Sequence, residues 1–172
     1  LTVLAAVLDG DSGARLDRAL TQGPDRVADS ASAGNGLLGR GPQLFTLGAV
    51  PAAGKTAAQV EAALRAQVAR VAEQGVSETE LARVKTQWVA SEVYKRDSVM
   101  GQAQELGHLW VQGLPLDADE RLVARLRQVT AAQVQAVARQ YFGDDQLTVA
   151  TLLPQPRAGG AAPRPAAAPA RH

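Results

Sequence analysis

The chain has 172 residues, of which 46% are hydrophobic but only 3% are aromatic. Its 18 basic and 17 acidic residues are interspersed and give a net charge of +1, which argues against the concentrated positive face of a nucleic-acid-binding protein. The absence of cysteine excludes disulfides and thiolate metal sites. No apolar run approaches the roughly 20 residues of a membrane span. The sequence starts without Met and inside a predicted helix, so we expect a fragment of a larger or processed protein.

The first third of the chain predicts two helices followed by a hairpin. Residues 1–8 are almost entirely apolar and predict a buried helix that ends at an Asp-Gly pair, without the basic leader and cleavage site of a signal peptide. Apolar spacing over residues 14–20 predicts a second helix, which a Gly-Pro pair stops. Residues 27–33 and 43–50 predict two strands, and the Gly-rich segment between them lets the strands pair as a hairpin.

The middle of the chain is marked by three helix starts of one type. Thr56, Ser77 and Thr130 are each followed three positions later by Gln or Glu, the pattern of the capping box. We therefore predict helices from these residues, a break or kink at residues 96–98, and a short helix from about residue 117. The stretch after the break carries an apolar stripe at Val99, Ala103, Leu106 and Trp110.

The last part of the chain predicts a returning strand and a tail. Residues 146–153 alternate between apolar residues and threonine, which indicates a third strand. Residues 155–172 are rich in Pro and Ala and predict a disordered tail on a domain formed by residues 1–154. The order of elements predicts an α+β fold, with helices packed on one face of a mainly antiparallel sheet.

No pattern in the sequence predicts a catalytic or metal-binding site. The histidines are His108, which has no ligand-type residue at helical spacing, and the terminal His172. Serines occur without the Gly-x-Ser-x-Gly elbow of a hydrolase. Trp88 and Trp110 lie on apolar stripes and are interpreted as anchors of the core or of a domain interface, together with Tyr94 at the interface.

Several motifs in this order resemble the C-terminal domain of bacterial zinc peptidases of the pitrilysin/insulinase (M16) family. Residues 8–16 (Leu-Asp-Gly-Asp-Ser-Gly-Ala-Arg-Leu) resemble the passage between the family's first two helices, and residues 75–85 (Gly-Val-Ser-Glu-Thr-Glu-Leu-Ala-Arg-Val-Lys) resemble the start of its long helix. Residues 129–138 and 141–154 are similar to its last helix and closing strand. The resemblance implies a LuxS/processing-peptidase-like metallohydrolase domain whose N-terminal strand is missing.

The resemblance also implies where the chemistry lies. The family's zinc ligands are an inverted His-x-x-Glu-His helix and a downstream Glu in an N-terminal domain, and no such motif is found here, so we expect zinc in the parent protein but not in this chain. The family also holds substrate with an Arg and a Tyr. Arg18 corresponds to the Arg, whereas Asp29 stands where the Tyr is expected.

We therefore expect the noncatalytic C-terminal domain of a zinc metalloendopeptidase, inactive alone. It would wall the chamber in which extended peptides are cleaved and dock the zinc-bearing N-terminal domain, with a homologous M16 subunit as a possible further partner. The resemblance alone places the parent protein in the periplasm or outside the cell. Two alternatives stay open: an inactive scaffold or assembly subunit of the same fold, as in the core subunits of respiratory complex III, and an unrelated helical adaptor.

Overall fold

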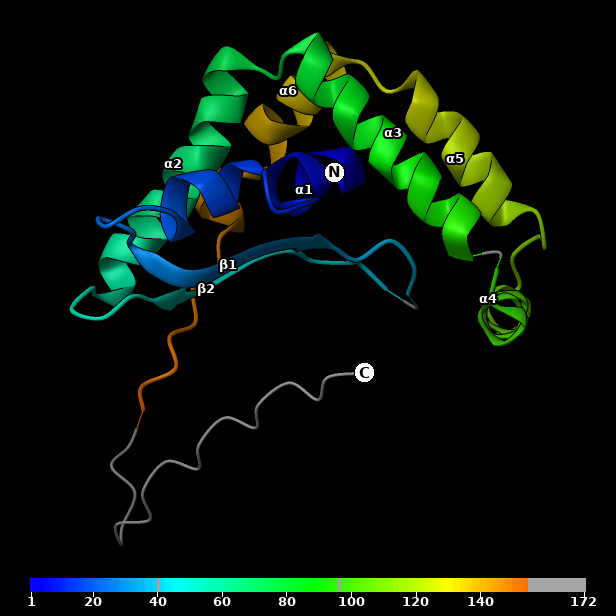
Figure 1. Cartoon of the computed structure of the whole chain (residues 1–172), viewed down its shortest axis with the longest axis horizontal. Coiled ribbons are helices and arrows are strands. Elements are labelled where there is room, and N and C mark those ends of the chain that lie inside the picture. The colour runs from blue at the N-terminus through cyan, green and yellow to red at the C-terminus, as the bar shows by residue number, and fades with distance from the viewer. Residues whose placement is uncertain (40, 96, 155–172) are drawn as a thin grey trace, which may run out of the picture.

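The computed structural model describes residues 1–39, 41–95 and 97–154, so the predicted tail at 155–172 lies outside the described residues. Helices cover one face of a two-stranded antiparallel sheet (Figure 1), and the predicted α+β fold class is confirmed. The elements in chain order are α1 (Thr2–Asp9), η1 (Asp17–Thr21), β1 (Ala28–Asn35), β2 (Phe45–Pro51), α2 (Ala57–Gln74), α3 (Glu78–Lys95), α4 (Val99–Val111), α5 (Ala118–Gln128), α6 (Ala131–Tyr141) and η2 (Asp144–Gln146). None of the helices in this part of the chain has the length and apolar content to cross a membrane.

The sheet is the predicted hairpin, with β1 and β2 joined through the Gly-rich segment. In the antiparallel register Ala33 lies opposite Leu47 and Ala31 opposite Ala49, and these side chains face the helices. Alternate positions such as Ser32 carry small, exposed side chains on the opposite face. This alternation follows from the two-residue period of a strand, which buries one face and leaves the other open.

The predicted third strand is wrong in this structure. Residues 147–154 form no strand and continue away from the sheet (Figure 1), and Gln146 belongs to the short helix η2. The side chains of Leu147, Val149 and Leu152 are exposed. Alternating apolar residues give a segment the tendency to form a strand, but a strand also needs a neighbour for its backbone N–H and C=O groups. None of the described residues supplies that neighbour.

The hydrophobic core surrounds α1, which lies between the sheet and the helices α2, α3 and α6 (Figure 1). Leu and Val dominate this core, as the low aromatic content predicts. Its largest fully buried side chains are Leu4, Val7, Leu8, Leu16, Leu20, Val71, Leu81 and Val134. An aromatic pair, Phe45 on β2 and Phe142 after α6, closes one side with ring centroids 4.9 Å apart in an edge-to-face arrangement.

Two of the three predicted capping boxes form completely. The hydroxyls of Thr56 and Thr130 each accept a hydrogen bond from the backbone N–H three residues later, and the glutamine there accepts one from the cap residue's N–H. At Ser77 only the first half forms, with the Glu80 N–H donating to the Ser77 hydroxyl over 3.1 Å. The second half of that prediction is wrong because the Glu80 carboxylate is bound by a distant arginine, Arg15.

Helix α4 differs most from its predicted packing. The break before it is confirmed, since Ser98 caps α4 by accepting a 3.0 Å hydrogen bond from the N–H of Gly101. The predicted apolar stripe, however, is exposed, including Trp110, and Leu109 is the buried residue of this helix. A role of Trp110 in the core of this chain is therefore wrong, because α4 extends beyond α3 and α5 rather than lying against α1 (Figure 1).

Candidate functional site

A cleft of about 610 Å³ opens between η1, α2 and the start of α3. Its walls are polar and rich in arginine, with one carboxylate among the lining residues. They are Arg15, Arg18, Ala19, Gln67, Arg70, Gln74, Ser77, Thr79, Glu80 and Arg83. The cleft is therefore a positively charged recess in a chain whose total charge is only +1.

Helical spacing brings these side chains to one place. Arg15 and Arg18 are three residues apart in the helical stretch 15–21, so they share one side of it. Gln67 and Arg70 stand in the same relation on α2, and Glu80 and Arg83 follow on the first turns of α3. Three separate elements thus contribute a cationic group to one recess.

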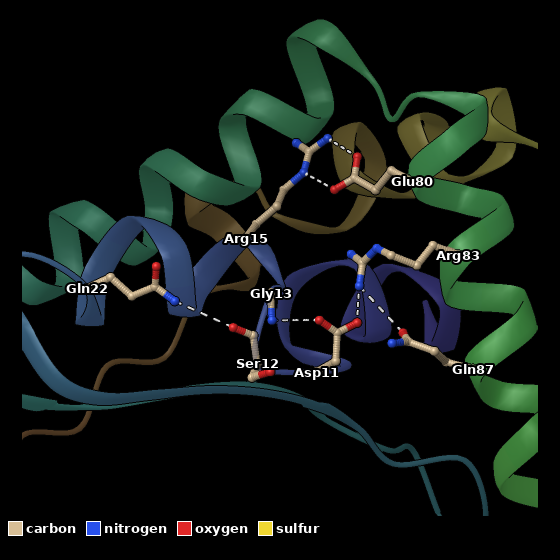
Figure 2. Close-up of polar contacts among 8 residues, drawn as sticks. All are labelled: Asp11, Ser12, Gly13, Arg15, Gln22, Glu80, Arg83 and Gln87. Carbon is tan, nitrogen blue, oxygen red and sulfur yellow. Dashed lines mark hydrogen bonds and ion pairs between the residues drawn. The ribbon is translucent and has the colours of Figure 1, made fainter.

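Arg15 and Glu80 form the best-defined polar contact of the cleft (Figure 2). The Arg15 Nε donates to Glu80 Oε1 over 2.8 Å, and Nη2 donates to Oε2 over 2.7 Å and to the carbonyl of Gly75 over 3.1 Å. Both side chains are largely buried, at 18% and 13% exposed. Hydrogen bonding from Arg15 outweighs the effect of burial and lowers the pKa of Glu80. The pair is a bidentate salt bridge that holds the wall of the cleft in place.

A second network supports Arg83. Asp11 accepts a 2.7 Å hydrogen bond from the Gly13 N–H through Oδ1 and pairs with Arg83 through Oδ2, and Arg83 also reaches the Gln87 amide oxygen over 3.5 Å (Figure 2). Burial raises the pKa of Asp11, but hydrogen bonds from Gly13, Gln87 and Arg83, together with the charge of Arg83, lower it. Arg83 is therefore neutralised within the chain.

Two arginines of the cleft are left without a carboxylate. Across the described residues, neither Arg18 nor Arg70 forms a side-chain hydrogen bond or ion pair, and both are exposed. Gln67 also lines the cleft and is only 6% exposed. Its amide forms no hydrogen bond with any of the described residues. These groups are available to a ligand.

A smaller hollow of about 360 Å³ lies between α1, the end of β1 and α3. The carboxylate of Asp9 closes part of it by accepting a 3.0 Å hydrogen bond from the backbone N–H of Ala33. Trp88 lines the hollow, and its indole Nε1 is buried without a hydrogen-bond partner in the described structure. The hollow is mostly apolar and holds no pair of groups arranged for chemistry.

A distal patch of exposed apolar side chains lies at the end of α3 and along α4. Its residues are Val93, Tyr94, Val99, Met100, Leu106, Trp110 and Val111, with exposed fractions from 46% to 84%. Helix α4, which carries most of these residues, extends from the end of α3 at the opposite end of the molecule from α2 (Figure 1). Exposed apolar side chains gathered on one part of a protein commonly mark a contact with another protein.

The structure separates the residues that the sequence singles out. Arg18 lines the cleft, whereas Asp29 lies on β1, outside the cleft, and accepts 3.1 Å hydrogen bonds from Arg26. Trp88 lies at the hollow, while Tyr94 and Trp110 belong to the distal patch. Sequence reasoning missed Gln67 and Arg70, although their three-residue spacing on a capped helix was a usable signal.

In residues 1–39, 41–95 and 97–154, no three His, Cys, Asp or Glu side chains are grouped so that they could hold a metal ion. His108 is exposed on α4. The polar geometry therefore offers ion pairing and hydrogen bonding, and the apolar geometry offers a protein contact.

Comparison with known families identifies the fold. The profile of a family described as the peptidase M16 inactive domain matches residues 1–88, half of the chain. The chain belongs to this family. The M16 resemblance inferred from the sequence motifs is thereby confirmed. No curated protein matches the chain.

Solved structures agree with this assignment of the M16 domain. A protease from Helicobacter pylori superimposes with a TM-score of 0.76 at 19% identity, covering 84% of this chain and 34% of that protein. A candidate zinc protease from Bordetella pertussis Tohama I superimposes with a TM-score of 0.70 at 20% identity, covering 85% of this chain and 79% of that protein. The inactive peptidase domain of a candidate zinc protease from Bordetella parapertussis gives 0.72 at 20% identity, with coverages of 90% and 83%. The M16 domain thus spans about a third of the Helicobacter protein.

Proposed function

We propose that this M16 domain is the noncatalytic partner of a zinc-bearing domain in a metalloendopeptidase. Its role is to bind that domain and to form part of the wall of the chamber in which extended peptides are cleaved. The observation that carries the proposal is the match of residues 1–88 to an inactive peptidase domain. It is supported by the similarity to two proteins described as candidate zinc proteases.

The distal patch is the proposed docking surface. Trp and Tyr are the residues that most often dominate the binding energy of a protein interface, and Trp110 and Tyr94 are both exposed here. Helix α4 makes few contacts with the remainder of the described chain, so its apolar face is free to pack against another domain. The zinc-bearing domain is the occupant we propose, because the matched family is described as the inactive domain of a peptidase, which implies an active partner.

The open edge of β2 is the proposed contact for substrate backbone. Gly36 donates to the carbonyl of Leu44 over 3.1 Å, which fixes the alternation of the antiparallel ladder. By this alternation Phe45 and Leu47 direct their backbone N–H and C=O groups away from β1. An extended peptide can pair with such an edge as an added strand.

The proposal is tested by reconstitution with a purified zinc-bearing M16 domain from the same organism. We expect EDTA-sensitive cleavage of a quenched fluorescent peptide only in the mixture. The double variant Y94S/W110S should lower this activity by about tenfold, equivalent to about 1.4 kcal/mol of binding energy at subsaturating concentration. L152S, which makes a similar change at an exposed site outside the patch, should leave it unchanged.

Three other results contradict parts of the proposal. Stoichiometric zinc binding or peptide hydrolysis by the 172-residue chain alone contradicts the noncatalytic role. Equal activity of Y94S/W110S and the unmodified chain contradicts the distal patch as the docking surface. A stable complex that cleaves no peptide contradicts the peptidase role and favours the scaffold alternative.

A further inference from the structure

We infer that the cleft between η1, α2 and α3 binds an acidic stretch of polypeptide through Arg18 and Arg70. Both arginines line the recess from different elements, so they can hold two carboxylates of one segment. None of the cleft residues belongs to the distal patch, and the inference does not rest on the docking role.

The charges of the cleft favour an anion. Of its four arginines, Arg15 is neutralised by Glu80 and Arg83 by Asp11. Arg18 and Arg70 form no side-chain hydrogen bond or ion pair among the described residues, although the charge of Glu80 also acts on Arg18. A guanidinium presents several N–H donors in a plane, which matches the two oxygens of a carboxylate. The start of α3 also lies at this recess and adds the positive end of a helix dipole.

A polar side chain in the same wall is available to a ligand. Gln67 is only 6% exposed as a residue and lines the cleft without a hydrogen-bond partner in the described chain. Among the described residues, only the Trp88 Nε1 is a fully buried side-chain polar atom without a partner, so the Gln67 amide meets the solvent of the cleft. A ligand that supplies a carbonyl or N–H at the cleft can bind this amide in place of water.

The size and lining of the cleft favour a peptide over a free ion. Its volume of about 610 Å³ is far more than a single carboxylate or phosphate occupies. Gln67, Gln74, Ser77 and Thr79 offer both donors and acceptors, which complement the N–H and C=O of a peptide backbone. Phosphate, which would also bind arginine, is treated as an outcome of the test.

The test measures binding of a fluorescein-labelled peptide of alternating Glu and Gly to the 172-residue chain by fluorescence anisotropy at low salt and neutral pH. We expect saturable binding that weakens as salt is added, since salt screens exposed charges. The matching peptide of Gln and Gly should not bind. The double variant R18Q/R70Q should weaken binding of the acidic peptide about tenfold, or about 1.4 kcal/mol.

The matched control is R125Q/R127Q, which removes the same charge from exposed positions on α5, outside the cleft. We expect this control to change the affinity less than twofold, by screening of distant charge. An equal loss in both double variants would show non-specific attraction and overturn the inference. Absence of binding, or binding of the Gln peptide with the same affinity, would overturn it as well.

Two further measurements separate the ligand and the role of the amide. Inorganic phosphate that displaces the peptide at concentrations well below those of added chloride would make this a phosphate site and overturn the peptide assignment. Q67M keeps the side-chain volume but removes the amide, and we expect about threefold weaker peptide binding with the fold retained. Unchanged affinity of Q67M would contradict the inferred contact.

Discussion

Arg15 and Glu80 lie 65 residues apart in the sequence and are joined by two hydrogen bonds of 2.8 and 2.7 Å. The contact connects the helical stretch that contains η1 to the first turn of α3. It also redirects a carboxylate that would otherwise complete the capping box of α3. Helix α3 is therefore anchored to a distant segment at its start, where the arginine-lined cleft opens.

Replacement of Glu80 should destabilise the fold. In E80Q the charged partner of the largely buried Arg15 is lost, so we expect the free energy of unfolding to fall by about 1.5–3 kcal/mol at neutral pH. Urea denaturation followed by circular dichroism measures this change. E78Q is the matched control, because Glu78 lies at the start of the same helix and its side chain is exposed. An equal effect of both substitutions would contradict a specific role of the pair.

The same variant has a defined pH dependence. Because folding lowers the pKa of Glu80, its contribution is complete above the pKa of the unfolded chain, about 4.3, and is lost as the pH falls through the lower folded pKa. In E80Q the side chain at this position does not titrate. The stabilities of E80Q and the unmodified chain should therefore approach each other below about pH 4. A difference that stays constant from neutral to acid pH would contradict the ionic origin of the contact.

Local chemistry predicted the parts of the fold that are decided locally. The helix starts at Thr56 and Thr130 depend on residues three positions apart, and both formed as expected. The hairpin follows from two strand-like runs around a flexible glycine-rich link. The M16 family followed from motifs that lie within such local segments.

Long-range partners could not be predicted in the same way. Nothing near Glu80 in the sequence indicates that its carboxylate binds Arg15 rather than its own helix start. The apolar alternation of residues 147–153 indicates a strand, but only the three-dimensional structure shows that no described neighbour pairs with it. The stripe on α4 had the correct period, yet periodicity does not reveal whether an apolar face contacts this chain or another protein.

The hydroxyl caps should each contribute to stability. In T130A the Gln133 N–H loses its acceptor, and we expect the free energy of unfolding to fall by about 1 kcal/mol. Thermal unfolding followed by circular dichroism measures this loss as a lower Tm. T86A, in the interior of α3, is the control and should be neutral or slightly stabilising, since Ala favours helix interiors. A larger loss in T86A than in T130A would contradict the capping contribution.

Trp88 should tolerate loss of its N–H but not of its ring. Its buried Nε1 has no hydrogen-bond partner in the described structure, so W88F removes an unsatisfied donor while retaining most of the aromatic surface. We expect W88F to change the free energy of unfolding by less than about 1 kcal/mol, whereas W88A should lower it by about 2–3 kcal/mol. Chemical denaturation of both variants separates the effect of losing the indole N–H from the effect of losing the aromatic ring. A W88F variant as unstable as W88A would indicate that the indole N–H has a partner.

A carboxyl pair between α4 and α5 should loosen the helix that carries the distal patch. Hydrogen bonding to Asp119 is the largest factor that raises the pKa of Glu105, followed by burial and by the negative charge of Asp119. Because the folded pKa is raised, stabilisation by this pair is complete below the unfolded pKa of about 4.3 and is lost as the pH rises through the folded pKa. At neutral pH two like charges therefore oppose the attachment of α4.

E105Q should relieve this repulsion. The neutral amide can donate a hydrogen bond to Asp119 at all pH values, so we expect amide hydrogens of α4 to exchange about two- to threefold more slowly at neutral pH. The difference should vanish at acid pH, where Glu105 of the unmodified chain is protonated as well. E73Q at an exposed position near the end of α2 serves as a comparison for the general effect of removing one negative charge. Faster exchange of α4 in E105Q would mean that the carboxylate of Glu105 holds the helix in place, through an attraction to Lys95, more strongly than Asp119 repels it.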